Sequence, residues 1–173
     1  MNFDISNDAA PKATTPGKID AAASIPRSAW FGYLARTVLT FMFWSSALAK
    51  LGDAEAALAE MRHFGLEPDL LYYFLTVITL VIGSLLVICD RWTWLGAGAL
   101  AVFTLLTIPI AHDFWAMEEP RKTAEFHVAM EHITVVGGLL VAIYASAIRK
   151  KWASGDPDSR MFEIASRKGY FQP

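Results

Sequence analysis

The stretch LLYYFLTVITLVIGSLLVIC, residues 70–89, runs for twenty positions without a charged side chain. The next stretch, WTWLGAGALAVFTLLTIPIA at residues 92–111, is equally long and also uncharged. A hydrocarbon core about 30 Å thick is crossed by roughly 20 helical residues, because each residue advances the helix by about 1.5 Å. Backbone amides in lipid must be satisfied within the segment, which favours helices over strands despite the many β-branched residues. Both stretches are therefore predicted to be transmembrane helices.

Two further apolar stretches, residues 30–51 and 126–148, are long enough to cross a membrane although they carry some charge. Both are bounded by charged residues and by aromatic rings of the kind that anchor helices at lipid headgroups. The sequence thus predicts an all-α integral membrane four-helix bundle over residues 29–150. A flexible N-terminal tail is expected over residues 1–28 and a cytoplasmic C-terminal tail over residues 151–173. The aromatic residues near the predicted ends are Trp30, Tyr72, Tyr73, Trp92, Trp94, Trp115 and Trp152.

The composition agrees with a membrane protein and excludes several other classes. Of the 173 residues 54% are hydrophobic and only 18% are charged, against about 25% charged in ordinary soluble domains. The net charge of −2 excludes a basic surface for nucleic acid. A single cysteine, Cys89, excludes an internal disulfide and any multi-cysteine zinc or iron–sulfur site. The predicted partner of the protein's apolar helices is the lipid bilayer.

Lysines and arginines are unevenly distributed between the two sets of loops. Ten lie in the two tails and the second loop, and four lie in the first and third loops. Because positive residues stay cytoplasmic, both termini are predicted to face the cytoplasm. A cleaved signal peptide ending near residues 47–49 is the alternative for the first span. The 29 residues before Trp30, and Arg36 within the run, argue against it.

All four histidines fall on the predicted outer side of the membrane. His63 lies in the first loop, His112 closes the third span, and His127 and His132 open the fourth. The third and fourth spans are joined by one loop, so the last three histidines must end close together. Ionisable groups at such a rim often line a cavity or carry chemistry. The candidate site comprises Lys50, His112, Asp113, Trp115, His127, Glu131 and His132.

Spacing suggests how this candidate site is arranged. His127 and Glu131 are four residues apart and share a helix face, whereas His132 lies about 100° further round. Pro109 removes one backbone hydrogen bond and is expected to kink the third span before His112, opening a polar vestibule. Such a vestibule would supply the hydrogen-bond donors and proton path that a quinone headgroup needs.

Two other interpretations of the same residues remain. The first is an interfacial lid whose histidines and acids are simply wetted by headgroups. The second is a haem or metal held by imidazoles, which requires histidines at matching depth inside the bundle. The four histidines lie near the rim, and the sequence has no HExxH, CxxC or CxxCH motif. No metal is therefore predicted.

Arg36 is the most deeply placed charge in the predicted spans. It could extend its side chain to the inner headgroups or to a polar or carbonyl partner, as a long arginine stem allows. Alternatively, it could form an ion pair or ligand clamp inside the bundle. The other spans have no acid at mid-depth, which favours the first interpretation.

The remaining features are predicted to be structural. Residues 53–65 are expected to form a short helix that begins at Asp53 and ends at Gly65. Its apolar side chains would lie on the outer membrane surface. Cys89 is expected to be inert packing. Glycines in the third and fourth spans are expected to permit close helix contact. The apolar side chains are Leu58, Met61 and Phe64, and the glycines are Gly96, Gly98, Gly137 and Gly138.

Taken together, several of these stretches resemble the DoxX family of small membrane proteins. They are LARTVLTFMFWSSALAKL at residues 34–51, GLEP at 65–68, PIAHDFW at 109–115, and His132 with the Gly137-Gly138 pair. The resemblance covers about residues 30–150 and implies a four-helix membrane bundle with cytoplasmic termini. It draws attention to Arg36, Lys50, His112, Asp113 and Trp115 without implying a catalytic role for any of them.

The resemblance also implies a class of function. Some family members resemble the large subunit of thiosulfate:quinone oxidoreductase, and others associate with redox or sulfur-handling proteins. The leading hypothesis is a protein that supports quinone-linked electron transfer or redox homeostasis, with a non-covalent quinone and a redox protein or second copy as partner. His112 would bond the headgroup, Asp113 would orient it, and His127 and Glu131 would exchange protons.

Two alternatives to this hypothesis stay open, and so does the question of whether the chain is an enzyme. One is a non-enzymatic membrane anchor or scaffold for a soluble oxidoreductase. The other is a small-solute transporter, which the scarcity of polar residues at mid-membrane disfavours.

Overall fold

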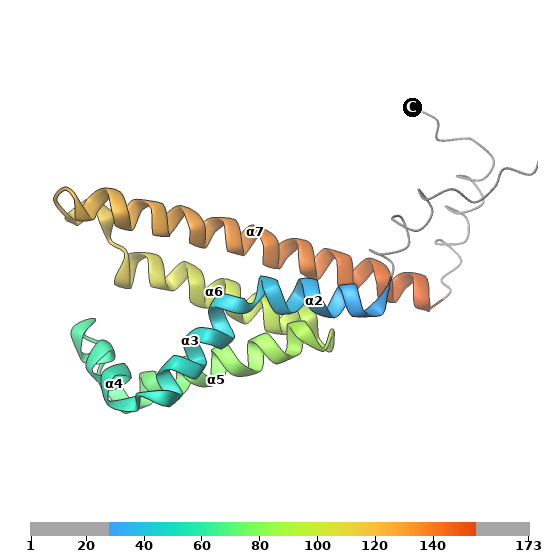
Figure 1. The fold of residues 1–173 in the computed structure, drawn as a ribbon, viewed down its shortest axis with the longest axis horizontal. Helices are drawn as coiled ribbons and strands as arrows, with labels where there is room; N and C mark the ends of the chain where they lie inside the picture. The colour runs from blue at the N-terminus through green and yellow to red at the C-terminus, as the bar shows by residue number, and fades with distance from the viewer. Residues whose placement is uncertain (1–27, 155–173) are drawn as a thin grey trace, which may run out of the picture. The chain divides into compact units, whose positions relative to one another are not determined.

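The computed structural model describes residues 28–154, and every regular element in that range is helical (Figure 1). The predicted tails lie mostly outside the described residues. Within the described range, residues 33–154 belong to one compact unit, and the packing contacts below lie within it. The helices are α2 (Ala29–Leu39), α3 (Phe41–Gly52), α4 (Ala54–His63), α5 (Asp69–Ile88), α6 (Thr93–Ala111), the 3₁₀ helix η2 (Phe114–Ala116) and α7 (Arg121–Ala153).

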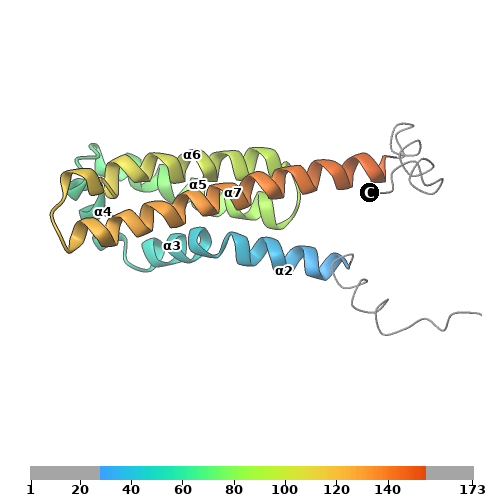
Figure 2. The same cartoon turned by 90° about the horizontal axis from the view of Figure 1, so that it is seen from above.

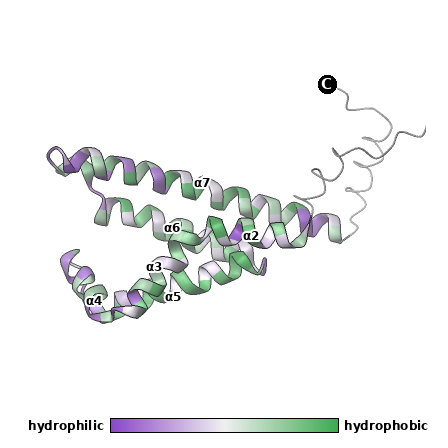
Figure 3. Cartoon of the chain, viewed as in Figure 1, coloured by the Kyte–Doolittle hydropathy of each residue, from purple (hydrophilic) through white to green (hydrophobic). Residues whose placement is uncertain are grey.

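Three segments of the described chain are long and apolar enough to cross a membrane. They are Asp69–Ile88, Thr93–Ala116 and Arg121–Ala153, which correspond to the second, third and fourth predicted spans. Figure 3 shows apolar colouring along the middle of α5 and α6, with hydrophilic colouring on α4 and at the start of α7. Helix α7 extends beyond the predicted span at both ends. The all-helical membrane architecture is thus confirmed for three of the four spans.

The first predicted span is divided into two helices of 11 and 12 residues, α2 and α3. Thr40 stands between them, and its hydroxyl donates a hydrogen bond to the Arg36 carbonyl at 2.8 Å. The indole N–H of Trp44 donates to the Thr37 carbonyl at 3.2 Å. In a continuous helix this carbonyl would accept a hydrogen bond only from the backbone amide four residues later. Side chains that compete for backbone groups in this way bend or break helices. A fourth complete crossing therefore stays a prediction.

The core lies where α6 packs against both α5 and α7 (Figure 2). Leu80, Leu100 and Leu139 are almost completely buried there, and Phe43 of α3 joins them. Many large apolar side chains on the outer faces of the same helices are about half exposed. Apolar residues on both the inner and outer faces are expected for helices surrounded by lipid.

The four glycines singled out from the sequence divide into two groups. A Cβ on Gly96 would lie 2.8 Å from the Gly83 carbonyl oxygen, and one on Gly138 would lie 2.8 Å from a methyl of Leu39. Gly98 and Gly137 have nothing within 4 Å of that position. Close contact is therefore confirmed for Gly96 and Gly138, and the prediction is wrong for the other two. Gly83 of α5, a position that the sequence argument overlooked, forms the other side of the contact at Gly96.

Helix α4 begins and ends at the predicted residues. The Asp53 carboxylate accepts a hydrogen bond from the Ala56 amide at 2.9 Å, and Gly65 adopts φ +68 directly after the C-cap. The amides of Gly65 and Leu66 donate back to the last turn at 3.0 and 2.9 Å, which satisfies two terminal carbonyls. A residue in the left-handed region is needed for this ending, and glycine adopts it without strain.

The position of α4 differs from the prediction. Met61 is 4% exposed and packs with Ala57 against Tyr73 and Val77 of α5. Leu58 is partly buried against the same cluster. The apolar side of α4 therefore faces the helical bundle rather than the membrane surface, because α5 offers a matching apolar face at its N-terminal end.

Replacing Asp53 by alanine is expected to lower the free energy of unfolding by about 1 kcal/mol, since an N-cap side chain typically contributes that much. Unfolding in mixed micelles of dodecylmaltoside and SDS, followed by circular dichroism, measures the change. Asp53→Asn is the control and should retain most of the stability, because asparagine caps about as well. Equal losses in both variants would contradict the cap.

Candidate ligand site

A polar cavity of about 320 Å³ lies among α3, α4, α6 and α7. Its walls are partly apolar, with Phe43, Leu80 and Phe103 deep among the helices. Three separate parts of the chain bring ionisable groups to it: the end of α3, the middle of α4, and the junction of α6 with α7. These groups are Lys50, Glu60, His112, Arg121, Glu125 and His132.

Two histidines lie side by side in this cavity. The His112 and His132 ring centroids are 4.9 Å apart. His112 Nδ1 lies 2.7 Å from Glu125 Oε2, and His132 Nδ1 lies 2.8 Å from the Val128 carbonyl oxygen. An ionised carboxylate and a carbonyl can only accept, so each Nδ1 carries the hydrogen and donates. In the neutral rings Nε2 is then the accepting nitrogen of both histidines.

Helix geometry explains how α7 presents its part of the site. Glu125 and His132 are seven residues apart, which is nearly two turns, so they lie along one face of the helix. Arg121 stands one turn before Glu125, with its Nε 3.7 Å from Glu125 Oε1. Helix α6 ends at Ala111, so His112 is its C-cap and approaches this face. Glu125 is thereby held between a guanidinium and an imidazole.

Another part of the cavity wall carries an ion pair between α3 and α4. Lys50 Nζ contacts Glu60 Oε2, and the lysine side chain is only 12% exposed. The hydroxyl of Tyr73 donates to the Lys50 carbonyl at 3.3 Å, which ties this end of α3 to α5. The burial of Met61 fixes α4 and so brings Glu60 within reach of the lysine. The cavity is therefore lined by one ammonium and two imidazoles.

The structure gathers only part of the predicted site. Lys50, His112 and His132 line the cavity, whereas His127 and Glu131 are exposed and do not. Asp113 begins η2, and Trp115 of η2 is 57% exposed, in contact with Phe114. The site therefore uses the α7 face of His132, which the sequence argument had placed apart from His127 and Glu131.

Three cavity residues were missed from sequence: Glu60, Arg121 and Glu125. The seven-residue spacing from Glu125 to His132 was a usable signal, because it places a carboxylate and an imidazole on one helical face. Glu60 gave no comparable signal, since its position depends on how α4 packs. Within residues 28–154 no group of three or more His, Cys, Asp or Glu side chains is arranged to hold a metal ion.

A second polar cluster occupies the other end of the helices, around Asp90 in the turn between α5 and α6. Asp90 Oδ1 accepts hydrogen bonds from the hydroxyls of Ser146 at 2.6 Å and Thr93 at 2.8 Å. Its Oδ2 accepts from Arg149 at 2.5 Å. Partial burial acts to raise the pKa of Asp90, but these hydroxyls and the nearby charges of Arg149 and Arg36 outweigh it and lower the pKa.

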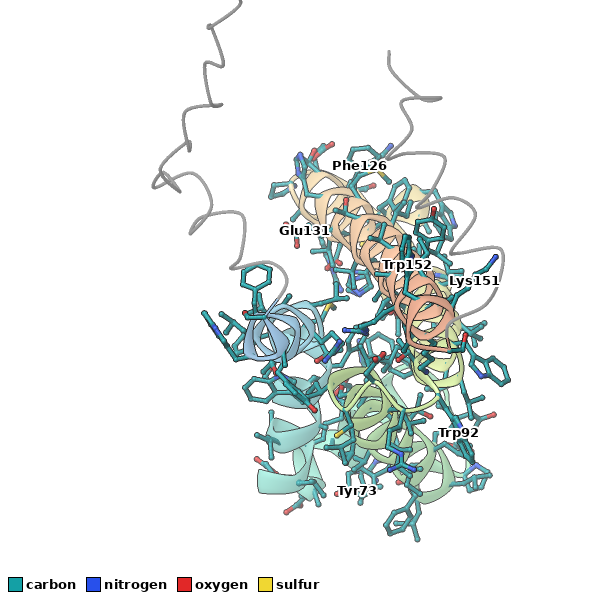
Figure 4. All side chains as sticks on the ribbon, turned by 90° about the vertical axis from the view of Figure 1, so that its right-hand side faces the viewer. Tyr73, Trp92, Phe126, Glu131, Lys151 and Trp152 are labelled. Carbon is teal, nitrogen blue, oxygen red and sulfur yellow. The ribbon has the colours of Figure 1, made fainter. Side chains whose placement is uncertain are left out.

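Arg36 is directed to this cluster. Its Nε donates to the Ile88 carbonyl at 3.0 Å, the carbonyl partner that the sequence left open for it. Figure 4 looks along the helices from this end, where Trp92 and Trp152 lie toward the viewer. Cys89 is exposed beside the turn rather than packed. The cluster joins the α5–α6 turn to the C-terminal part of α7 and has a structural role.

Comparisons with known proteins support the resemblance seen in the sequence. The model of the DoxX family matches residues 32–113, which cover α3 to α6 and the cavity residues Lys50, Glu60 and His112. Comparison with curated proteins and with solved structures gave no match. Residues 32–113, with the membrane-type helices that they form, thus belong to the DoxX family.

Proposed function

We propose that this protein is a bacterial inner-membrane protein that binds a quinone headgroup in the polar cavity and exchanges protons with it. The observation that carries the proposal is that Lys50 lines the same cavity as the paired rings of His112 and His132. A quinone has two carbonyl oxygens on opposite sides of its ring. The Lys50 ammonium can donate to one of them, and a histidine whose ring is protonated can donate to the other through Nε2, because its Nδ1 already donates to Glu125 or to the Val128 carbonyl.

Reduction of the quinone would draw its protons from the cavity residues and its electrons from a partner protein. Reduction of a quinone consumes two electrons and two protons and yields the hydroquinone. A protonated imidazole can pass its Nε2 proton to one quinone oxygen, the Lys50 ammonium can pass a proton to the other, and both groups are reprotonated from water. Glu125 fixes the tautomer and the orientation of the His112 ring through its bond to Nδ1. The electrons would come from a redox protein bound on the same side of the membrane.

The predicted topology gives this site a location. With both termini in the cytoplasm, the cavity opens toward the outer side of the membrane. The acids of the first and third loops surround it there, so a soluble electron donor would approach from outside. Proton exchange is then expected with the outer aqueous phase.

Replacing His112 by alanine is expected to weaken binding of a benzoquinone without a side chain by about tenfold, which corresponds to the loss of one hydrogen bond to a charged group. Glu125→Gln should weaken it by about threefold, since the amide orients the ring less well. The protein in phosphatidylcholine nanodiscs is titrated with the quinone, and quenching of tryptophan fluorescence reports binding.

The matched control is His127→Ala, at an exposed position of α7 five residues before His132. It should bind the quinone as the parent does. If His112→Ala also binds it unchanged, the site assignment fails. If quinone binding is unaffected by His112→Ala and the purified protein retains a soluble oxidoreductase, the result would instead favour the hypothesis of a membrane scaffold.

A further inference from the structure

The polar cavity adjoins an apolar cavity beside α5 and α6, and this apolar cavity adjoins a second one. The first, of about 260 Å³, shares Lys50, Glu60, Phe64 and Thr107 with the polar cavity. The second, of about 530 Å³, shares Thr79 and Leu106 with the first. Phe103 of α6 borders all three. The three cavities therefore follow one another along α6, and the row that they form, here called the path, runs from the ion pair to Gly98 and Trp94.

The path becomes apolar as it leaves the ionisable groups. Leu75, Leu106 and Ile110 line its first part, and Leu95 and Val102 line the second. Thr107 and Gly98 are nine residues apart, so this path follows α6 for about 14 Å. Gly98 has nothing within 4 Å of its Cβ position, which leaves the far part of the path open.

We propose that this path holds the hydrocarbon chain of the ligand whose headgroup occupies the polar cavity, so that the site selects a long-chain prenyl quinone over a short one. The inference rests on the proposed function. The position of the path next to the charged cavity favours this occupant, because a single molecule with a polar ring and an apolar chain satisfies both parts. The path borders half-exposed residues of α5 and α6, so the ligand would enter sideways from the lipid.

Recognition of the ligand's hydrocarbon chain depends on dispersion contacts with the protein rather than on the hydrophobic effect. A chain in the bilayer already has apolar surroundings, so the transfer gains little hydrophobic free energy. The gain comes from dispersion contacts, each about 0.1–0.2 kcal/mol, made with fixed helices. Roughly ten such contacts correspond to about a tenfold preference.

The test compares a benzoquinone carrying a decyl chain with the same ring lacking the chain, in phosphatidylcholine nanodiscs with the quinone expressed per lipid. The parent protein should bind the decyl compound about tenfold more tightly. Gly98→Phe should remove most of this preference by filling the path, and Leu106→Trp should do the same nearer to the headgroup. Neither variant should change binding of the ring alone.

Gly137→Phe is the matched control, because Gly137 of α7 also has open space around its Cβ position and lies outside the path. It should leave both affinities unchanged. If the decyl chain adds no affinity, or if Gly98→Phe weakens both compounds alike, the chain path is overturned while the headgroup site can stand. If ring binding is indifferent to His112→Ala, the proposed function fails instead.

Discussion

Replacing Gly96 by alanine is expected to lower the free energy of unfolding by about 2 kcal/mol. The added Cβ would lie 2.7 Å from Leu86 Cβ and 2.8 Å from the Gly83 carbonyl oxygen. Neither atom is the end of a flexible side chain, so α5 and α6 must move apart. Overpacking of this kind costs about 3 kcal/mol, and the better helix propensity of alanine offsets about 1 kcal/mol of it.

The matched control is Gly98→Ala, two residues further along the same helix. With nothing within 4 Å of its Cβ position, alanine there meets no neighbour and should leave stability unchanged or slightly higher. Unfolding of both variants in mixed micelles of dodecylmaltoside and SDS provides the comparison. Equal stabilities for Gly96→Ala and Gly98→Ala would contradict the close contact between α5 and α6.

The same pair of helices shows what hydropathy can predict. The uncharged stretches at residues 70–89 and 92–111 correspond to α5 and α6 within one residue at each end. Length and the need to satisfy backbone amides in lipid suffice for that result. The break at Thr40 could not be read in the same way. The break depends on hydrogen bonds that the Thr40 hydroxyl and the Trp44 indole donate to backbone carbonyls. A hydropathy average over a stretch of residues contains no information on such bonds.

The candidate site was predictable to the extent that it follows from chain connectivity. His112 and His132 flank one loop, so their proximity is almost forced. The choice between the face of His132 and that of His127 depends on how α7 is rotated against α6, which is a packing property. Glu60 reaches Lys50 only because α4 folds onto α5, and the sequence argument had placed α4 on the membrane surface.

At the opposite end of the helices, Asp90→Ala is expected to lower the free energy of unfolding by about 3 kcal/mol. The change removes three hydrogen bonds to a carboxylate, from Ser146, Thr93 and Arg149. It also leaves alanine at φ +55, where aspartate is better tolerated. Two variants separate these causes: Asp90→Gly removes the bonds but suits the backbone, and Asp90→Asn keeps an acceptor oxygen but loses the charge.

The charge of Asp90 also predicts how this contribution depends on pH. Hydrogen bonds from Ser146 and Thr93, and the charge of Arg149, lower the pKa of Asp90 in the folded protein against the opposing effect of burial. A carboxyl whose pKa is lowered by folding stabilises the folded state above its unfolded pKa of about 3.9, and this stabilisation is lost as the pH falls through the folded value. The difference in unfolding free energy between the parent and Asp90→Asn should therefore be constant near neutral pH. It should shrink as the pH is lowered past 4. A difference that stays the same from neutral to strongly acidic pH would mean that Asp90 acts through its shape alone, and that the ionised carboxylate does not hold the α5–α6 turn to α7.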